Sequence, residues 1–210
     1  MNLHLSKIAT LVLTGLLASS AQAFEFDFQH IADTEGEAGY AAYVRSDAGV
    51  QVTATGSDYA NIGNSPNYYA YLDSGNAGLG VCKVLTSNDQ CSPSSDDNVT
   101  LDEALTLVFD QQVVLNEVRF RNANHGTTFN GDIDISTDGG SSFMTIALSH
   151  LYSTPLVGTN FVFAHNATNG DQFYIETIGG EIAATGVAAP GSLLLTGSLL
   201  GFAARRRRAR

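Results

Sequence analysis

The stretch TLDEALTLVFDQQVVLNEVRFRN, residues 100–122, has the clearest strand pattern in the chain. Leu105, Leu107 and Phe109 recur at every second position. Because side chains two positions apart point to the same face of a β-strand, this spacing predicts a strand with one buried face. Two glutamines at residues 111–112 separate it from a second alternating run, and we interpret them as a turn between two strands.

The same pattern begins immediately after the first 23 residues. In FEFDFQHI, residues 24–31, the phenylalanines at 24, 26 and 28 fall on one face and polar residues fall on the other. This alternation predicts a half-buried strand that includes Phe28.

A third segment, GDIDISTDGGSSFMTI at residues 131–146, predicts a β-hairpin. Asp138-Gly139-Gly140 supplies residues that tolerate the positive φ of a tight hairpin turn. The residues expected to face inward are Ile133 and Ile135, and those expected to face outward are Asp132, Asp134 and Ser136.

Segments of this kind predict nine or ten short strands and no long helix. Thr100 could cap a helical turn with Glu103 three residues later, but the alternation that follows argues against more than one turn. We therefore expect an all-β domain over residues 24–180, an antiparallel two-sheet sandwich of the jelly-roll type.

Residues 1–23 have the pattern of a secretory signal peptide, which would be helical. Lys7 provides the positive start, residues 8–18 are apolar, and Ala21 and Ala23 occupy the positions that signal peptidase prefers. The alternative is a buried N-terminal helix. The switch to strand alternation directly afterwards favours the signal peptide.

The C-terminal end has three parts: a linker at residues 181–190, an apolar segment at 191–204 and an Arg-rich tail at 205–210. Residues 182–204 carry no charge and could form a helix of about 34 Å, enough to cross a bilayer. The arginines would stay cytoplasmic by the positive-inside rule, so the domain would lie outside. The alternative is an amphipathic helix packed on the sandwich, where the clustered arginines would repel one another.

This tripartite end resembles the sorting signal of the PEP-CTERM family of Gram-negative bacteria. The motif positions are Val187, Ala188, Ala189, Pro190 and Gly191, and the basic stop is formed by Arg205, Arg206, Arg207, Arg208 and Arg210. Ala-Ala-Pro stands here where Pro-Glu-Pro is usual in the family.

The resemblance implies a membrane protease of the exosortase type as a partner. It also implies transient anchoring in the inner membrane, followed by release to the cell surface or the extracellular space. Members of the family are often associated with exopolysaccharide and biofilm matrix.

The charge of the body limits its partners. Between Phe24 and Pro190 only four Lys and Arg residues face all 21 acidic residues, which leaves this part with a net charge of −17. Such a body should repel nucleic acid and anionic lipid. Cations, neutral sugars and basic surfaces are the partners that remain.

Cys82 and Cys91 are the only two cysteines. An even count at short spacing in an exported protein predicts a disulfide, here closing the polar loop KVLTSNDQ. The chain-entropy model gives such a loop about 2–3 kcal/mol. Metal binding is the alternative, but two thiols without nearby histidines make a poor zinc site.

The loop SPSSDDN contains the candidate metal ligands Asp96, Asp97 and Asn98. Their oxygen atoms suit Ca²⁺. The alternative is a solvated turn with side-chain to backbone hydrogen bonds.

Two other charged groups admit a functional and a structural interpretation. Asp132 and Asp134 could act as a glycosidase acid and base, with Asp138 at the adjoining turn, although a solvated face is the better interpretation. Arg119 and Arg121 could bind a uronate, or could form cross-strand salt bridges with Asp132 or Asp134.

The remaining chemistry-bearing residues form no known catalytic pattern. His30, His125, His150 and His165 lack metal-ligand spacing, and neither a nucleophile elbow nor a phosphate loop is present. Tyr68, Tyr69 and Tyr71 could stack on sugars, but packing within the sheet is favoured and the chain has no tryptophan.

We therefore expect a non-catalytic exported protein of the cell surface or matrix that needs no cofactor. The alternative is a carbohydrate-binding module for extracellular polysaccharide, which could depend on Ca²⁺. A secreted hydrolase is the third reading.

Overall fold

The computed structural model describes residues 22–165 and 169–183. The predicted sorting tail from Val187 onward lies outside the described residues, as does the predicted signal peptide up to residue 21. In the part that is described, no helix has the length and apolar character needed to cross a membrane.

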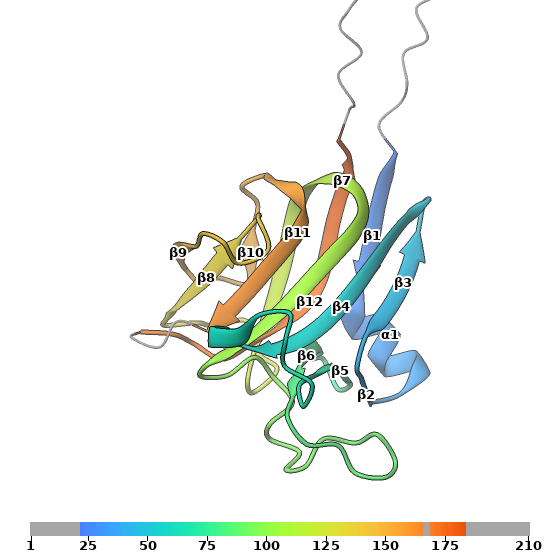
Figure 1. The fold of residues 1–210 in the computed structure, drawn as a ribbon, viewed down its shortest axis with the longest axis vertical. Coiled ribbons are helices and arrows are strands. Elements are labelled where there is room, and N and C mark those ends of the chain that lie inside the picture. The colour runs from blue at the N-terminus through green and yellow to red at the C-terminus, as the bar shows by residue number, and fades with distance from the viewer. Residues whose placement is uncertain (1–21, 166–168, 184–210) are drawn as a thin grey trace, which may run out of the picture.

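The described residues form twelve strands and two short helices (Figure 1). The first strands are β1 (Ala23–Asp27), β2 (Ala38–Tyr40), β3 (Tyr43–Asp47), β4 (Val50–Asp58), β5 (Tyr69–Asp73) and β6 (Gly78–Cys82). The later strands are β7 (Glu103–Asn122), β8 (Asp132–Ser136), β9 (Met144–Ala147), β10 (Leu151–Tyr152), β11 (Leu156–His165) and β12 (Phe173–Ile182). The helices are α1 (Phe28–Glu35) and the 3₁₀ turn η1 (Tyr59–Asn61).

All twelve strands pair antiparallel and belong to one hydrogen-bonded sheet, so the all-β antiparallel prediction is confirmed. Strand β7 joins two parts of this sheet. Its residues 103–109 pair with β4, whereas its residues 113–122 pair with β12. We call these parts the β4 half and the β12 half. The strands thus form one antiparallel sheet whose two halves are joined by β7.

The predicted turn at residues 111–112 is wrong, because both glutamines lie inside β7. A register shift between Gly158 and Asn160 of β11 marks an irregularity opposite this point, which bends the strand without ending it. The polar side chains here serve the neighbouring β3–β4 hairpin. Asp110 accepts a hydrogen bond from the backbone N–H of Gln51, and Gln111 donates one to the carbonyl of Gly49.

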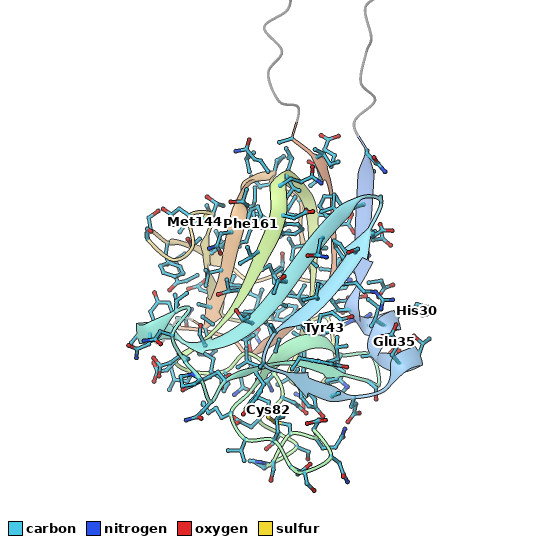
Figure 2. The ribbon with its side chains drawn as sticks, turned by 45° about the vertical axis from the view of Figure 1, so that its right-hand side comes forward. His30, Glu35, Tyr43, Cys82, Met144 and Phe161 are labelled. Carbon is cyan, nitrogen blue, oxygen red and sulfur yellow. A yellow bond between two sulfur atoms is a disulfide. The ribbon has the colours of Figure 1, made fainter. Side chains whose placement is uncertain are left out.

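Aromatic rings from both halves meet in the core. The ring of Phe109 lies 5.7 Å from that of Phe24 on β1 and 5.6 Å from that of Phe161 on β11. Leu105 and Leu107 are fully buried, as the alternation predicts. Figure 2 shows Phe161 among the strands, while Met144 lies nearer the rim. The inner faces of the two halves therefore share one apolar core.

The strand predicted at residues 24–31 ends earlier than expected. Phe28 begins helix α1, because the side chain of Asp27 accepts a hydrogen bond from the backbone N–H of His30 and caps the helix. Phe28 is still fully buried, since the helix turns it inward together with Ile31 and Ala32.

The outward placement of Asp134 and Ser136 is also wrong, since they are only 7% and 1% exposed. A separate apolar cluster covers the outer face of the sheet here. In it Tyr59, Ile62 and Phe143 pack against buried residues of β7 and β11. The hairpin itself is confirmed. β8 and β9 pair, and the turn glycines at 139 and 140 have positive φ.

Two neighbouring residues of β7 test which face is buried. Leu107 is fully buried and Val108 is 41% exposed. Leu107→Ala should lower the free energy of unfolding by about 2–5 kcal/mol because it leaves a cavity. Val108→Ala should cost less than about 1 kcal/mol. Urea unfolding followed by circular dichroism measures both, and equal losses would contradict the observed register.

Candidate functional site

A polar pocket of about 550 Å³ lies at the start of β12. Its titratable residues are Glu37, Asp73, Asp97, His125 and Tyr174. Ser94, Ser95, Asn98, Asn124 and Gln172 add hydroxyl and amide groups to its wall. We call it the acidic pocket.

Five separate segments meet at this pocket, one of which carries Glu37 between α1 and β2. Asp73 ends β5, Tyr174 is the second residue of β12, and His125 lies in the turn that follows β7. The loop before β7 is fixed to β12 by two backbone hydrogen bonds between Val99 and Phe173, of 2.8 and 3.2 Å. Because these two residues are neighbours of Asn98 and Tyr174, the bridge sets both at the pocket.

Asp73 and Tyr174 form the buried part of the pocket, and Asp97 beside them is half-buried. Tyr174 is 1% exposed, and its hydroxyl donates a hydrogen bond to Asp97. Burial, together with the nearby charge of Asp97, raises the pKa of Asp73 to about 6. Burial also raises the pKa of Asp97 and of Tyr174. The pocket therefore disfavours the negative charges of its own carboxyl groups.

His125 lies between two acceptors. Its Nδ1 is 2.7 Å from the carbonyl oxygen of Gly75, and its Nε2 is 3.2 Å from a carboxyl oxygen of Asp73. An imidazole with an acceptor at each nitrogen needs a proton at each of these contacts. The contact of Nε2 with Asp73 is an ion pair only when the imidazole carries both protons.

Asn98 provides an unsatisfied acceptor. Its residue is 3% exposed, and its side-chain Oδ1 has no hydrogen-bond partner within the described residues. Buried side-chain oxygens in folded proteins almost always have a partner, and leaving one unpaired costs about 1–3 kcal/mol. A donor that enters the pocket can supply the missing hydrogen bond.

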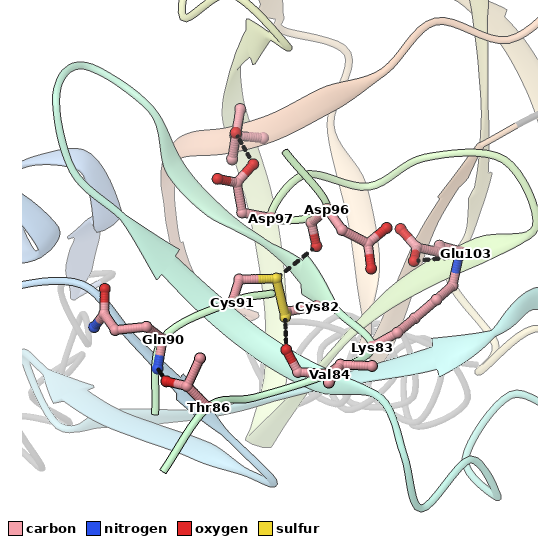
Figure 3. Close-up of a disulfide and its surroundings, with 10 residues drawn as sticks. Cys82, Lys83, Val84, Thr86, Gln90, Cys91, Asp96, Asp97 and Glu103 are labelled. Atoms are coloured by element: carbon pink, nitrogen blue, oxygen red, sulfur yellow. Dashed lines mark hydrogen bonds and ion pairs between the residues drawn. A yellow bond between two sulfur atoms is a disulfide. The ribbon is translucent and has the colours of Figure 1, made fainter. Parts of the chain in front are cut away.

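The predicted calcium ligands are divided by the structure. Asp97 and Asn98 line the acidic pocket, but Asp96 does not. Figure 3 shows the carboxylates of Asp96 and Asp97 pointing in different directions, that of Asp97 toward its hydrogen-bond partner on β12. Within residues 22–165 and 169–183, no three His, Cys, Asp or Glu side chains are grouped so that they could hold a metal ion. Calcium binding stays a prediction.

The predicted disulfide is present. Cys82 and Cys91 are bonded, with an S–S distance of 2.01 Å (Figure 3). Tyr71 packs against them. Cys82 is the last residue of β6, and Cys91 begins the segment that leads to Asp97. The bond thus anchors the pocket loop to the sheet.

One interpretation of the sequence paired the two arginines of β7 with Asp132 or Asp134. The structure gives them other partners. Arg121 makes two contacts with Glu176 of β12, at 2.8 and 2.9 Å. It therefore forms a cross-strand salt bridge, but with a different partner from the one expected. Arg119 pairs with Glu117 of its own strand. The reason is the register, because β12 and not β8 lies beside this part of β7.

No Lys or Arg of the described chain lines the acidic pocket. Arg45 pairs with Glu35 at 2.8 Å, and Lys83 pairs with fully buried Glu103 at 3.0 Å. Together with the two arginines of β7, every Lys and Arg between residues 22 and 183 is bound to a carboxylate elsewhere.

The other predicted residues lie apart from the pocket. Asp134 is buried and accepts hydrogen bonds from Tyr59 and Thr145. The hydroxyls of Ser136 and Ser142 lower the pKa of Asp138 to about 2. The remaining candidates are Asp132 at the start of β8, Tyr71 against the disulfide, Tyr68 near Lys83, Tyr69 on β5, His30 on α1, His150 near Glu176 and His165, buried at the end of β11.

Sequence reasoning missed Glu37, Asp73 and Tyr174, and it singled out His125 only as one of four scattered histidines. Asp73 follows an apolar strand and precedes Ser-Gly. This pattern predicts the end of a strand, but it does not predict which residues lie beside that end in the fold. The sequence alone could not bring residues this far apart to one place.

No protein-family model matches this chain, and neither does any curated protein or solved structure. The pocket is therefore interpreted from its own geometry.

Removing the charge of Asp73 should stabilise the protein at neutral pH. Its pKa is higher in the folded state than in the unfolded chain, so the folded state loses stability as the pH rises from about 4 through 6. At pH 8 the free energy of unfolding of Asp73→Asn, measured by urea denaturation, should exceed that of the wild type by about 1–2 kcal/mol. This difference should shrink toward pH 4. A gap that widens on acidification would contradict the burial of this carboxyl.

Proposed function

We propose that this chain is a non-catalytic exported protein of the cell surface or matrix, and that its β domain binds extracellular polysaccharide in the acidic pocket. The observation that carries the proposal is the buried, unpaired Oδ1 of Asn98 at the wall of a pocket lined by hydroxyl and amide groups. Sugar hydroxyls both donate and accept hydrogen bonds, so a wall of this composition complements them.

The position of the pocket fits display on a surface. The two ends of the described chain lie side by side, since Ala23 pairs with Glu181 (Figure 1). Tyr174 lies near the other end of β12, about 27 Å from Ile182 by the usual rise of a strand. A protein held by either terminus would therefore present the pocket away from its anchor.

The contacts of the two carboxyl groups support a binding role over hydrolysis. Tyr174 donates to Asp97, and His125 faces Asp73. A glycosidase needs one carboxyl free to protonate the leaving group and another free to act as base or nucleophile.

Export and sorting are the second part of the proposal. They rest on the signal-peptide pattern of residues 1–23 and on the resemblance of residues 187–210 to the PEP-CTERM tail. An exosortase-type protease would then be the processing partner, with transient anchoring in the inner membrane. We also propose that the two halves of the sheet act as the two layers of a jelly-roll-like sandwich.

Calcium-dependent binding is the second candidate for the pocket. Asp97 and Asn98 offer oxygen ligands, and a cation would relieve the raised pKa values of the two carboxyl groups. Binding that chelator abolishes and added Ca²⁺ restores would favour this version.

Binding to an array of polysaccharide fragments tests the pocket. Asn98→Ala should weaken binding of the best ligand at least tenfold, measured by calorimetry. Asn88→Ala is the matched control, because Asn88 is exposed in the disulfide loop and is not part of the pocket wall. Unchanged affinity in Asn98→Ala, or no bound glycan at all, would contradict the proposal.

The mass of the mature protein tests sorting. Protein from wild-type cells should lack residues 1–23 and the arginines after Ala204, whereas cells without the sorting protease should retain the arginines. Intact-mass spectrometry distinguishes these forms. A mature wild-type protein that still carries Arg205–Arg210 would count against processing.

A further inference from the structure

The acidic side chains of the pocket restrict the class of sugar that it can bind, and this inference rests on the proposed function. We propose that the pocket selects a cationic amino sugar, a hexosamine unit with a free primary ammonium, over neutral, N-acetylated or acidic sugars. The ammonium would lie between the carboxyl groups of Asp73 and Asp97 and the side-chain oxygen of Asn98.

The first argument is charge. Glu37, Asp73 and Asp97 line the pocket, and His125 is the single basic side chain among the lining residues. Because all four Lys and Arg of the described chain are paired elsewhere, the protein supplies no permanent cation here. A ligand with a positive charge would complete the charge balance of the pocket, whereas a uronate would meet the carboxyl groups of Asp73 and Asp97.

The second argument is the hydrogen bonding of Asn98. Its buried oxygen needs a donor, and the carboxyl oxygens around it are acceptors as well. A sugar hydroxyl donates only one hydrogen bond, but an ammonium donates three and accepts none. An ammonium can therefore donate one charge-assisted hydrogen bond to each of Asn98, Asp73 and Asp97 at the same time.

A calcium ion is a weaker match to the same atoms. Ca²⁺ takes six to eight oxygen ligands at about 2.3–2.6 Å. Here Tyr174 already donates to Asp97, and Glu37 accepts from the hydroxyl of Ser74 at 2.6 Å. Hydrogen bonds to an ammonium need only single oxygens at about 2.7–2.9 Å, which leaves these internal bonds intact.

The affinity should depend on pH. The charged or titratable groups around Asp73 are Asp97, Glu37, Tyr174 and His125. The raised pKa of Asp73, about 6, means that a proton occupies the carboxyl in acid and competes with a cation. A bound ammonium favours the ionised form of Asp73, so affinity should rise as the pH increases through about 6 and fall again where the amine of the sugar loses its proton.

The test compares two oligosaccharides of the same backbone, a glucosamine hexamer and its fully N-acetylated form, by calorimetry at pH 7 without divalent cations. We expect the glucosamine hexamer to bind at least tenfold more tightly, and to lose most of that advantage at pH 5. A hexamer of galacturonic acid should not bind.

Matched variants separate the pocket from the general acidity of the protein. Asp73→Asn should weaken glucosamine binding at least tenfold, and Asp97→Asn should act in the same direction. Asp89→Asn changes the net charge equally but lies in the exposed disulfide loop, so it should leave affinity unchanged. Thermal unfolding verifies that each variant is folded.

The outcomes distinguish this inference from the proposed function. Equal or tighter binding of the N-acetylated hexamer, or of the galacturonate, would overturn selection of a cation and leave sugar binding standing. Binding only with added Ca²⁺ would also overturn it. Equal losses in Asp73→Asn and Asp89→Asn would reveal diffuse attraction to an acidic surface, and no binding of any hexamer would count against both proposals.

Discussion

The fold depends on one strand that belongs to both halves of its sheet. Residues 103–109 of β7 pair with β4, and residues 113–122 pair with β12. Because the strand continues through its bend, the two inner faces come together, and the ring of Phe109 meets rings from both β1 and β11. A break in β7 would separate the halves and expose the core. Burial of this apolar surface is the main force that stabilises the fold.

The acidic pocket is a consequence of that arrangement. β12 runs beside β7 and carries Tyr174 to one end of the β12 half. The disulfide and the Val99–Phe173 bridge then fix the preceding loop so that Asp97 and Asn98 face the same space. The strand frame thus brings together buried polar groups that stabilise folding poorly on their own. A pocket in which a few polar groups are held at fixed places is characteristic of a binding site.

The all-β character, the β8–β9 hairpin and the disulfide could be predicted because they depend on local spacing. The continuity of β7 could not, since Gln111 and Gln112 look like a turn until their contacts with another hairpin are known. The burial of Asp134 likewise depends on a cluster contributed by distant residues. Asp97 and Asn98 were predicted as ligands from composition, but Asp73 and Tyr174 join them only through sheet register. Pairing between distant strands is a property of the whole fold, which local pattern does not encode.

The central claim is that the pocket is a rigid part of the folded sheet and exists before any ligand binds. Native-state hydrogen exchange of the Val99 and Phe173 amides tests it directly, because each N–H donates to the carbonyl of the other residue, beside Asn98 and Tyr174. We predict that both amides exchange only through global unfolding, with the same free energy and urea dependence as the amide of Leu107 in β7. Exchange of Val99 and Phe173 through a local opening at much lower free energy would contradict a preformed pocket.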